Sequence, residues 1–101
     1  MSMTDLLLNE RKTPKGRLVS VCDADILGEE FAYGERSLTV EPDFYDGSVA
    51  DPQTVLDSLA RCDVANLMGT TAVSLAVEEG FVDEANVLEL DGTQHAQLLW
   101  L

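Results

Sequence analysis

The chain has 101 residues, 46% of them hydrophobic, and its 19 Asp and Glu against 6 Lys and Arg give a formal net charge of −13. This length is enough for one domain that buries about two-thirds of its unfolded surface. The hydrophobic content excludes an acidic disordered tail, and no apolar run approaches the roughly 18 residues that span a bilayer. We therefore expect one folded, soluble domain that has no membrane partner.

The amino-terminal residues lack the basic, apolar and cleavage regions of a secretory signal. Cys22 and Cys62 lie in apolar surroundings, as is typical of reduced core thiols in a cytosolic protein. Both features predict a cytoplasmic location. The acidic residues are spread along the chain, which we interpret as adaptation to a salty cytoplasm, because at molar salt the Debye length is only about 3 Å. Under such screening, net acidity does not exclude a nucleic-acid partner.

Two strands are predicted near the amino terminus, over residues 6–8 and 17–23. The connection between them, residues 9–16, contains Pro14 and Gly16, which are common turn residues. The second strand is apolar at nearly every position, and we expect it to be covered on both faces.

Four of the six basic residues fall within or beside this connection. One interpretation is a solvated hairpin tip whose cations neutralise nearby carboxylates. The other is a projecting basic loop that contacts phosphates. The candidate nucleic-acid-binding residues are Arg11, Lys12, Lys15 and Arg17.

A short helix is predicted over residues 23–34, capped by Asp23 or Asp25 and weakened by Gly28. A third strand follows at residues 37–40. Asp51 and Pro52 then predict a sharp helix start, a capping carboxylate followed by proline at the first helical position.

This second helix has one apolar stripe and one polar face. The stripe consists of Val55, Leu56, Leu59 and Cys62, and the outward positions are Asp57, Ser58 and Arg61. The helix runs almost directly into the next predicted helix, with a turn near residues 62 and 63.

A long helix is predicted over residues 63–82, with Asp63 as its cap and Gly80 at the left-handed position after its end. Small residues recur along it at spacings of four, three and four residues, and this predicts close packing of that face. These residues are Ala65, Gly69, Ala72 and Ala76.

The same segment has a second interpretation, in which the helix starts later and Asn66 is its cap. Gly69, Thr70 and Thr71 then fall in the first turn, where N–H groups and hydroxyls bind a phosphate or carboxylate. In the long-helix interpretation, Gly69 is an interior glycine that costs about 1 kcal/mol relative to alanine. The small stripe favours packing. Asn66, Gly69, Thr70 and Thr71 are the candidate anion-binding residues, although neither common nucleotide-binding glycine motif is present.

The carboxyl-terminal region predicts a strand over residues 87–90, a turn at Asp91 and Gly92, and a last strand over residues 96–101. An apolar terminus is usually docked, so we expect this strand and Trp100 inside the sheet or against a partner. The order of elements predicts a single α+β domain, a mixed sheet packed against a helix pair and one short helix.

Several strings give the chain a family resemblance. They are CDADILGEEF, FYDG, NLMGTTAVSLAVEEGFVDEANVL and DGTQHAQ. Together they resemble the small archaeal family of domain of unknown function 424, over about residues 6–99, and the acidic composition is similar to that of its haloarchaeal members. The resemblance implies an archaeal cytosolic protein of about a hundred residues and no settled activity.

Few residues suggest catalysis. His95 is the only histidine, and we expect it to act with Gln97 as a polar site that holds a loop or contacts a ligand or RNA. A nucleophilic Cys22 or Cys62 acting with His95 is disfavoured, because no orienting group is evident. The paired ligand spacings of a zinc site are absent. We therefore expect no cofactor and no metal, and the glutamate pairs at 29–30 and 78–79 are predicted to be solvated helix faces.

Three classes of function remain. The first is a small non-enzymatic module that binds RNA or a ribonucleoprotein through the basic loop, in a translation-related role. The second is an adaptor that docks on a protein partner through the carboxyl-terminal strand and the sheet edge. The third is an enzyme of undefined type. The clustering of basic residues favours the first.

Overall fold

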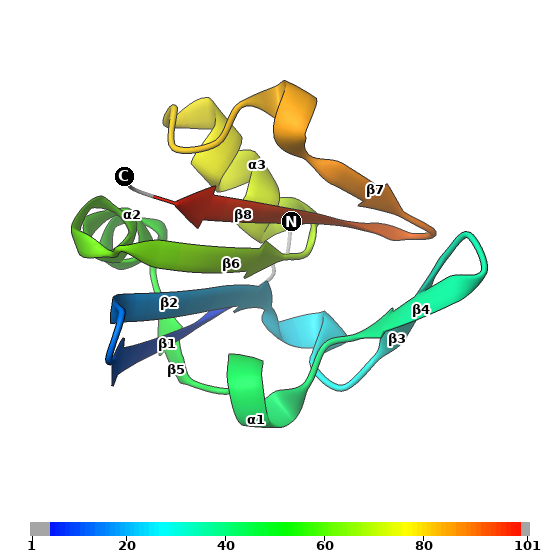
Figure 1. Cartoon of the computed structure of the whole chain (residues 1–101), viewed down its shortest axis with the longest axis horizontal. Coiled ribbons are helices and arrows are strands. Elements are labelled where there is room, and N and C mark those ends of the chain that lie inside the picture. The colour runs from blue at the N-terminus through cyan, green and yellow to red at the C-terminus, as the bar shows by residue number, and fades with distance from the viewer. Residues whose placement is uncertain (1–4, 100–101) are drawn as a thin grey trace.

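Six strands form one mixed sheet in the computed structural model, which describes residues 5–99 (Figure 1). They are β1 (Leu6–Thr13), β2 (Gly16–Asp23), β5 (Ser48–Ala50), β6 (Val64–Met68), β7 (Leu88–Leu90) and β8 (Thr93–Leu99). Their spatial order is β5, β1, β2, β6, β8, β7, and only β2 and β6 run parallel. The prediction of an α+β domain with a mixed sheet is confirmed.

The remaining elements lie on the faces and at one end of this sheet. The helices are α1 (Pro42–Tyr45), α2 (Pro52–Arg61) and α3 (Thr70–Glu78), with single 3-10 turns η1 (Ala24–Ile26) and η2 (Glu84–Asn86). Strands β3 (Glu30–Tyr33) and β4 (Arg36–Thr39) form a separate hairpin that extends away from the main sheet (Figure 1). No helix within residues 5–99 is both long and apolar enough to cross a membrane.

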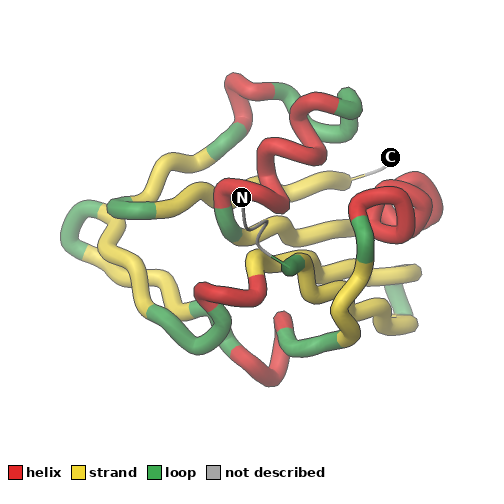
Figure 2. The backbone as a smooth tube through the Cα atoms, turned by 180° about the vertical axis from the view of Figure 1, so that it is seen from behind, coloured by secondary structure: helices red, strands yellow, loops and turns green. Residues whose placement is uncertain are grey.

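Each face of the sheet has its own apolar cluster. On the face covered by α2 and α3, Val19, Val21 and Leu67 pack with helical residues such as Leu59 and Val73. The opposite face buries Cys22, Met68 and Leu90 beneath η1, α1 and the β3–β4 hairpin. Figure 2 shows the molecule from behind, with α2 and α3 on the nearer side. Strand β2 is therefore buried on both faces, as its apolar sequence predicts.

The prediction of one long helix over residues 63–82 is wrong. Its first part is strand β6, in which Ala65 and Leu67 face the helices while Met68 faces the other cluster. Gly69 then has a φ of 110°, which no helical residue adopts, and α3 starts only at Thr70. The small residues are therefore divided between a strand and a helix, and β6 separates α2 from α3.

Two other boundaries differ from the predictions. The expected helix over residues 23–34 is only the turn η1, followed by strand β3, because Gly28 takes a φ of 85° and breaks the helical pattern. The expected loop over residues 9–16 is mostly strand. Strands β1 and β2 pair up to Thr13 and Gly16, leaving a two-residue turn at Pro14 and Lys15.

The start of α2 is confirmed, because Asp51 Oδ1 accepts a hydrogen bond of 2.7 Å from the N–H of Thr54, and Pro52 follows the cap. One outward position is wrong. Ser58 is only 1% exposed, and its hydroxyl hydrogen-bonds the Glu10 carboxylate.

The end of α3 is also confirmed. Gly80 has a φ of 81° and donates to the carbonyl of Val77 at 3.1 Å, while Phe81 donates to that of Ala76 at 2.9 Å. These two bonds define a Schellman motif.

The carboxyl-terminal hairpin is confirmed as well, with β8 between β6 and β7 inside the sheet. Trp100 and its expected docking lie outside the described residues.

Gly69 and Asp23 form the junction between the sheet and α3. Asp23 is 4% exposed, and its carboxylate accepts hydrogen bonds from the N–H groups of Thr71 and Ala72, at 3.0 and 2.9 Å. A Cβ atom at position 69 would lie 2.3 Å from Asp23 Cγ. Gly69 is therefore required both by its positive φ and by the side chain packed against it.

Substitution of Gly69 by alanine is expected to destabilise the fold more than substitution of Gly80. Both sites have a positive φ, which costs alanine about 1–2 kcal/mol in the left-handed region and more at Gly69, whose φ of 110° and ψ of 152° are essentially restricted to glycine. A Cβ at Gly80 has no neighbour within 4 Å, whereas one at Gly69 displaces Asp23, adding roughly 1–3 kcal/mol. Urea unfolding of the two variants measures the difference, and equal losses would show that the Asp23 contact is unimportant.

Candidate nucleic-acid interface

The β1–β2 hairpin places three of its four cations together. Lys12 is directly opposite Arg17 in the pairing, so both side chains lie on the face that α2 also covers. Lys15 is exposed in the turn between them. Thr13 closes this turn, because its hydroxyl accepts from the N–H of Lys15 at 3.2 Å and donates to the carbonyl of Gly16 at 2.9 Å.

A fourth cation joins them from the end of α2. Arg61 lines a groove of about 420 Å³ together with Lys12 and Arg17, and the other lining residues are Thr13, Gly16 and Asp63. We call Lys12, Lys15, Arg17 and Arg61 the basic patch. It contains four of the six basic residues of the chain.

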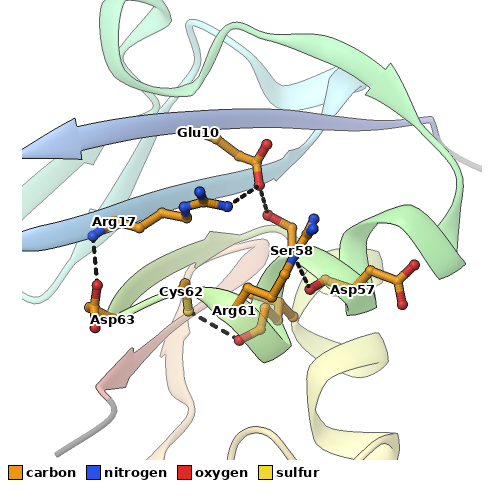
Figure 3. Close-up of polar contacts among 8 residues, drawn as sticks. Glu10, Arg17, Asp57, Ser58, Arg61, Cys62 and Asp63 are labelled. Atoms are coloured by element: carbon orange, nitrogen blue, oxygen red, sulfur yellow. Dashed lines mark hydrogen bonds and ion pairs between the residues drawn. The ribbon is translucent and has the colours of Figure 1, made fainter.

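Carboxylates and main-chain groups hold the two arginines of the basic patch (Figure 3). The Asp63 carboxylate accepts a hydrogen bond of 2.7 Å from the main-chain N–H of Arg17. The guanidinium of Arg17 lies 3.9 Å from the Glu10 carboxylate. Arg61 Nε donates to the carbonyl of Asp57 at 3.2 Å. Both arginines and the exposed Lys12 thus line the groove, while Lys15 is exposed in the adjoining turn.

Arg11 lies on the opposite face of the sheet from the basic patch. Its guanidinium stacks over Phe44 at 5.4 Å and hydrogen-bonds the carbonyl of Asp43 and Asn9 Oδ1. These contacts attach α1 to β1. The structure therefore separates Arg11 from the other three candidate residues of the hairpin.

Sequence reasoning missed Arg61, because helical periodicity indicates only that it faces outward. Arg61 lies in the last turn of α2, just before a strand that pairs with β2. This position indicates that Arg61 lies near the start of β2. This inference requires the correct assignment of β6.

The candidate anion site at the start of α3 is occupied by the protein itself. Asp23 takes the N–H groups of Thr71 and Ala72, the donors that an external phosphate would use. Gly69 and Thr70 adjoin this junction. Asn66 lies on β6 with its side chain on the other face, where Oδ1 accepts from Gln97 Nε2 at 2.9 Å. The structure does not bring Asn66 together with the other three residues.

Burial shifts the pKa of Asp23. Desolvation first, and then the charge of Asp25, raise its pKa above the ordinary value of 3.8, and together they exceed the lowering caused by hydrogen bonds from Thr71 and Ala72. A carboxyl whose pKa is higher in the folded state binds more protons there than in the unfolded state.

The stability contribution of Asp23 is therefore expected to decrease as pH rises from about 3.8 through the folded pKa. The measurement is the unfolding free energy of the wild type minus that of Asp23→Asn, which has no ionisation at this position. The difference should fall across that window. A difference that rises with pH would mean that the helix N–H groups dominate.

The second polar candidates, His95 and Gln97, lie on β8. Burial lowers the pKa of His95 below its ordinary 6.5, so the imidazole is neutral at pH 7. In the strand pairing His95 is opposite Met68, which is opposite Cys22. Two strand spacings, about 10 Å, therefore separate the main chain at Cys22 from that at His95.

The thiol of Cys22 is a poor nucleophile. Burial, followed by the nearby carboxylate of Asp23, raises its pKa to about 12. Within residues 5–99, no three His, Cys, Asp or Glu side chains form a group suited to a metal ion.

Charge is divided unequally between the two halves of the chain. All six cations precede residue 62, and residues 62–101 contain no lysine or arginine. The charged side chains of this segment are all carboxylates, namely Asp63, Glu78, Glu79, Asp83, Glu84, Glu89 and Asp91. The basic patch therefore lies at one end of a protein whose α3, β7 and β8 contain no cation.

The chain belongs to the family described as Protein of unknown function (DUF424), whose model matches residues 10–101. It is similar to an uncharacterized conserved protein from Methanopyrus kandleri known from a crystal structure, with 28% identity and a TM-score of 0.77. The similarity covers 96% of this chain and 95% of that chain. No curated protein matches the sequence. The predicted family is confirmed, and the similar fold extends over nearly the whole chain.

Proposed function

We propose that this protein is a non-enzymatic module that binds RNA or a ribonucleoprotein in the cytoplasm, in a translation-related role, and that the basic patch is its contact surface. The observation behind this proposal is the gathering of Lys12, Lys15, Arg17 and Arg61 from the hairpin and α2 on an otherwise acidic molecule. Basic side chains grouped in this way suit the phosphates of a nucleic-acid backbone.

The groove supports contacts of two kinds. The Glu10 carboxylate contacts the guanidinium of Arg17 and the Asp57 carbonyl that of Arg61, so both groups are held beside the groove, and guanidinium N–H groups suit hydrogen bonds to phosphate oxygens. Lys12 and Lys15 are exposed and supply further positive charge from the hairpin. The acidic remainder of the surface repels phosphate and restricts binding to this end.

The same proposal includes a salt-rich, haloarchaeal-type cytoplasm. Phosphate contacts weaken steeply as salt rises. Binding in that medium relies on hydrogen bonds and shape as well as charge, which favours structured or looped RNA over a uniform duplex. The two oriented arginines supply such hydrogen bonds.

Sedimentation of tagged protein from a native-salt lysate, with and without ribonuclease, tests this function. We expect the wild type to migrate with large particles and ribonuclease to release it. The combined variant Lys12→Ala, Lys15→Ala, Arg61→Ala should leave at least roughly tenfold more free protein. The control is Arg36→Ala, which removes an exposed cation on the β3–β4 hairpin outside the basic patch and should migrate as the wild type does.

Three results would count against the proposal. They are migration unaffected by ribonuclease, equal migration of the triple variant and the wild type, and an equal loss in Arg36→Ala. The first would indicate docking on a protein, and the last would indicate a general effect of charge.

A further inference from the structure

Strand β8 is longer than the strand that covers its outer side. Strand β7 pairs only with Thr93, Gln94 and His95, whereas β8 continues to Leu99. On its inner side β8 pairs with β6 along residues 95–99. The outer side of residues 96–99 therefore has no neighbouring strand in the described chain.

The main chain of this segment presents hydrogen-bonding groups outward. Gly69 donates to the carbonyl of Gln94 at 2.8 Å, so the main-chain groups of Gln94 point toward β6. Along a strand, the main-chain N–H and C=O groups of successive residues point to opposite sides. The groups of Ala96 and Leu98 therefore also point toward β6. The N–H and C=O groups of Gln97 and Leu99 consequently point toward the open side.

There is room beside these groups for another strand. A groove of about 450 Å³ is lined by Asn86, Leu88, His95, Ala96 and Gln97. Just before β7 the chain forms the 3-10 turn η2 instead of a strand. Strand β7 therefore begins too late to pair with residues 96–99 of β8. Leu99, at the far end, is 61% exposed.

We propose that this free edge of β8, residues 96–99, binds an extended basic peptide segment of another protein as an added strand. Main-chain hydrogen bonds to Gln97 and Leu99 supply the affinity, and the exposed Leu99 contacts an apolar side chain of the peptide.

Charge complementarity selects the basic partner. Residues 62–101 contain no lysine or arginine, and their carboxylates lie outside β8, which has none. Glu84 of η2 and Glu89 of β7 lie on the elements that flank the groove, and both line the neighbouring hollow against α3. Acidic peptides are repelled there, and so is a nucleic-acid backbone. This partner surface uses other residues than the basic patch, although Leu99 is paired with Val64 next to Asp63, and it does not depend on the RNA proposal.

The test titrates ¹⁵N-labelled full-length protein with a blocked peptide of alternating lysine and valine, six residues long. Hydrogen exchange at the Gln97 and Leu99 amides should slow on binding, and their resonances should shift. The Val49 amide, on the other outer edge of the sheet, is the internal control and should not change. An analogue methylated at alternate main-chain nitrogens keeps the charge but loses donors, and its affinity should fall roughly tenfold.

A matched pair of variants tests whether the main-chain N–H of residue 97 contributes to peptide binding. Gln97→Ala retains the outward N–H and should bind within about threefold of the wild type, whereas Gln97→Pro lacks it and should bind about as weakly as the methylated peptide. The amide spectrum of each variant shows whether the sheet is intact.

Equal binding of the methylated and unmodified peptides would overturn the proposal, because attraction to the acidic surface alone would then explain binding. Shifts confined to α3 without slower exchange at Gln97 and Leu99 would do the same. If those amides are protected without peptide, and increasingly so at higher protein concentration, the occupant is a second copy of this chain.

Discussion

The hydrogen bonds between the buried Asp23 carboxylate and the start of α3 join the central strands of the sheet to one of the helices that cover them. Asp23 ends β2, and Gly69 follows β6, the parallel neighbour of β2. One side chain therefore joins the central strand pair to the helix that covers it, and glycine is the residue that leaves space for this contact. The same junction directs Gly69 toward Gln94 and so positions β8. The site that could have bound an external anion is used to hold the structure together.

The fold converts an uneven distribution of charge along the chain into two separate surfaces. The β1–β2 hairpin and the end of α2 meet beside Asp63, where β6 begins, and this gathers cations from positions 12 to 61 in one groove. The second half of the chain then forms α3, β7 and β8 without adding a cation. A protein with a strongly negative net charge can thus offer a basic contact surface at one end and, elsewhere, a sheet edge flanked by elements that contain carboxylates but no cations.

Local signals allowed part of this structure to be predicted. Asp51 and Pro52 indicated α2, Gly80 indicated the end of α3, and the Asp91–Gly92 turn indicated the last hairpin. Strand β6 was missed for two reasons. Its small residue Ala65 fits the helical spacing of the small residues in α3, and a strand of five residues is too short to show clear alternation of apolar and polar residues. The role of Asp23 depends on a contact 48 residues away, and that of Arg61 depends on the register of β6, so neither is visible in a local pattern.

The most direct test of these two surfaces is amide chemical-shift mapping of the ¹⁵N-labelled protein during titration with a single-stranded RNA oligonucleotide. The account predicts shifts in residues 12–17 and 61–63 and no change in residues 96–99. Shifts centred on any other part of the molecule, or no shifts in the basic patch at RNA concentrations where the fold stays intact, would contradict it.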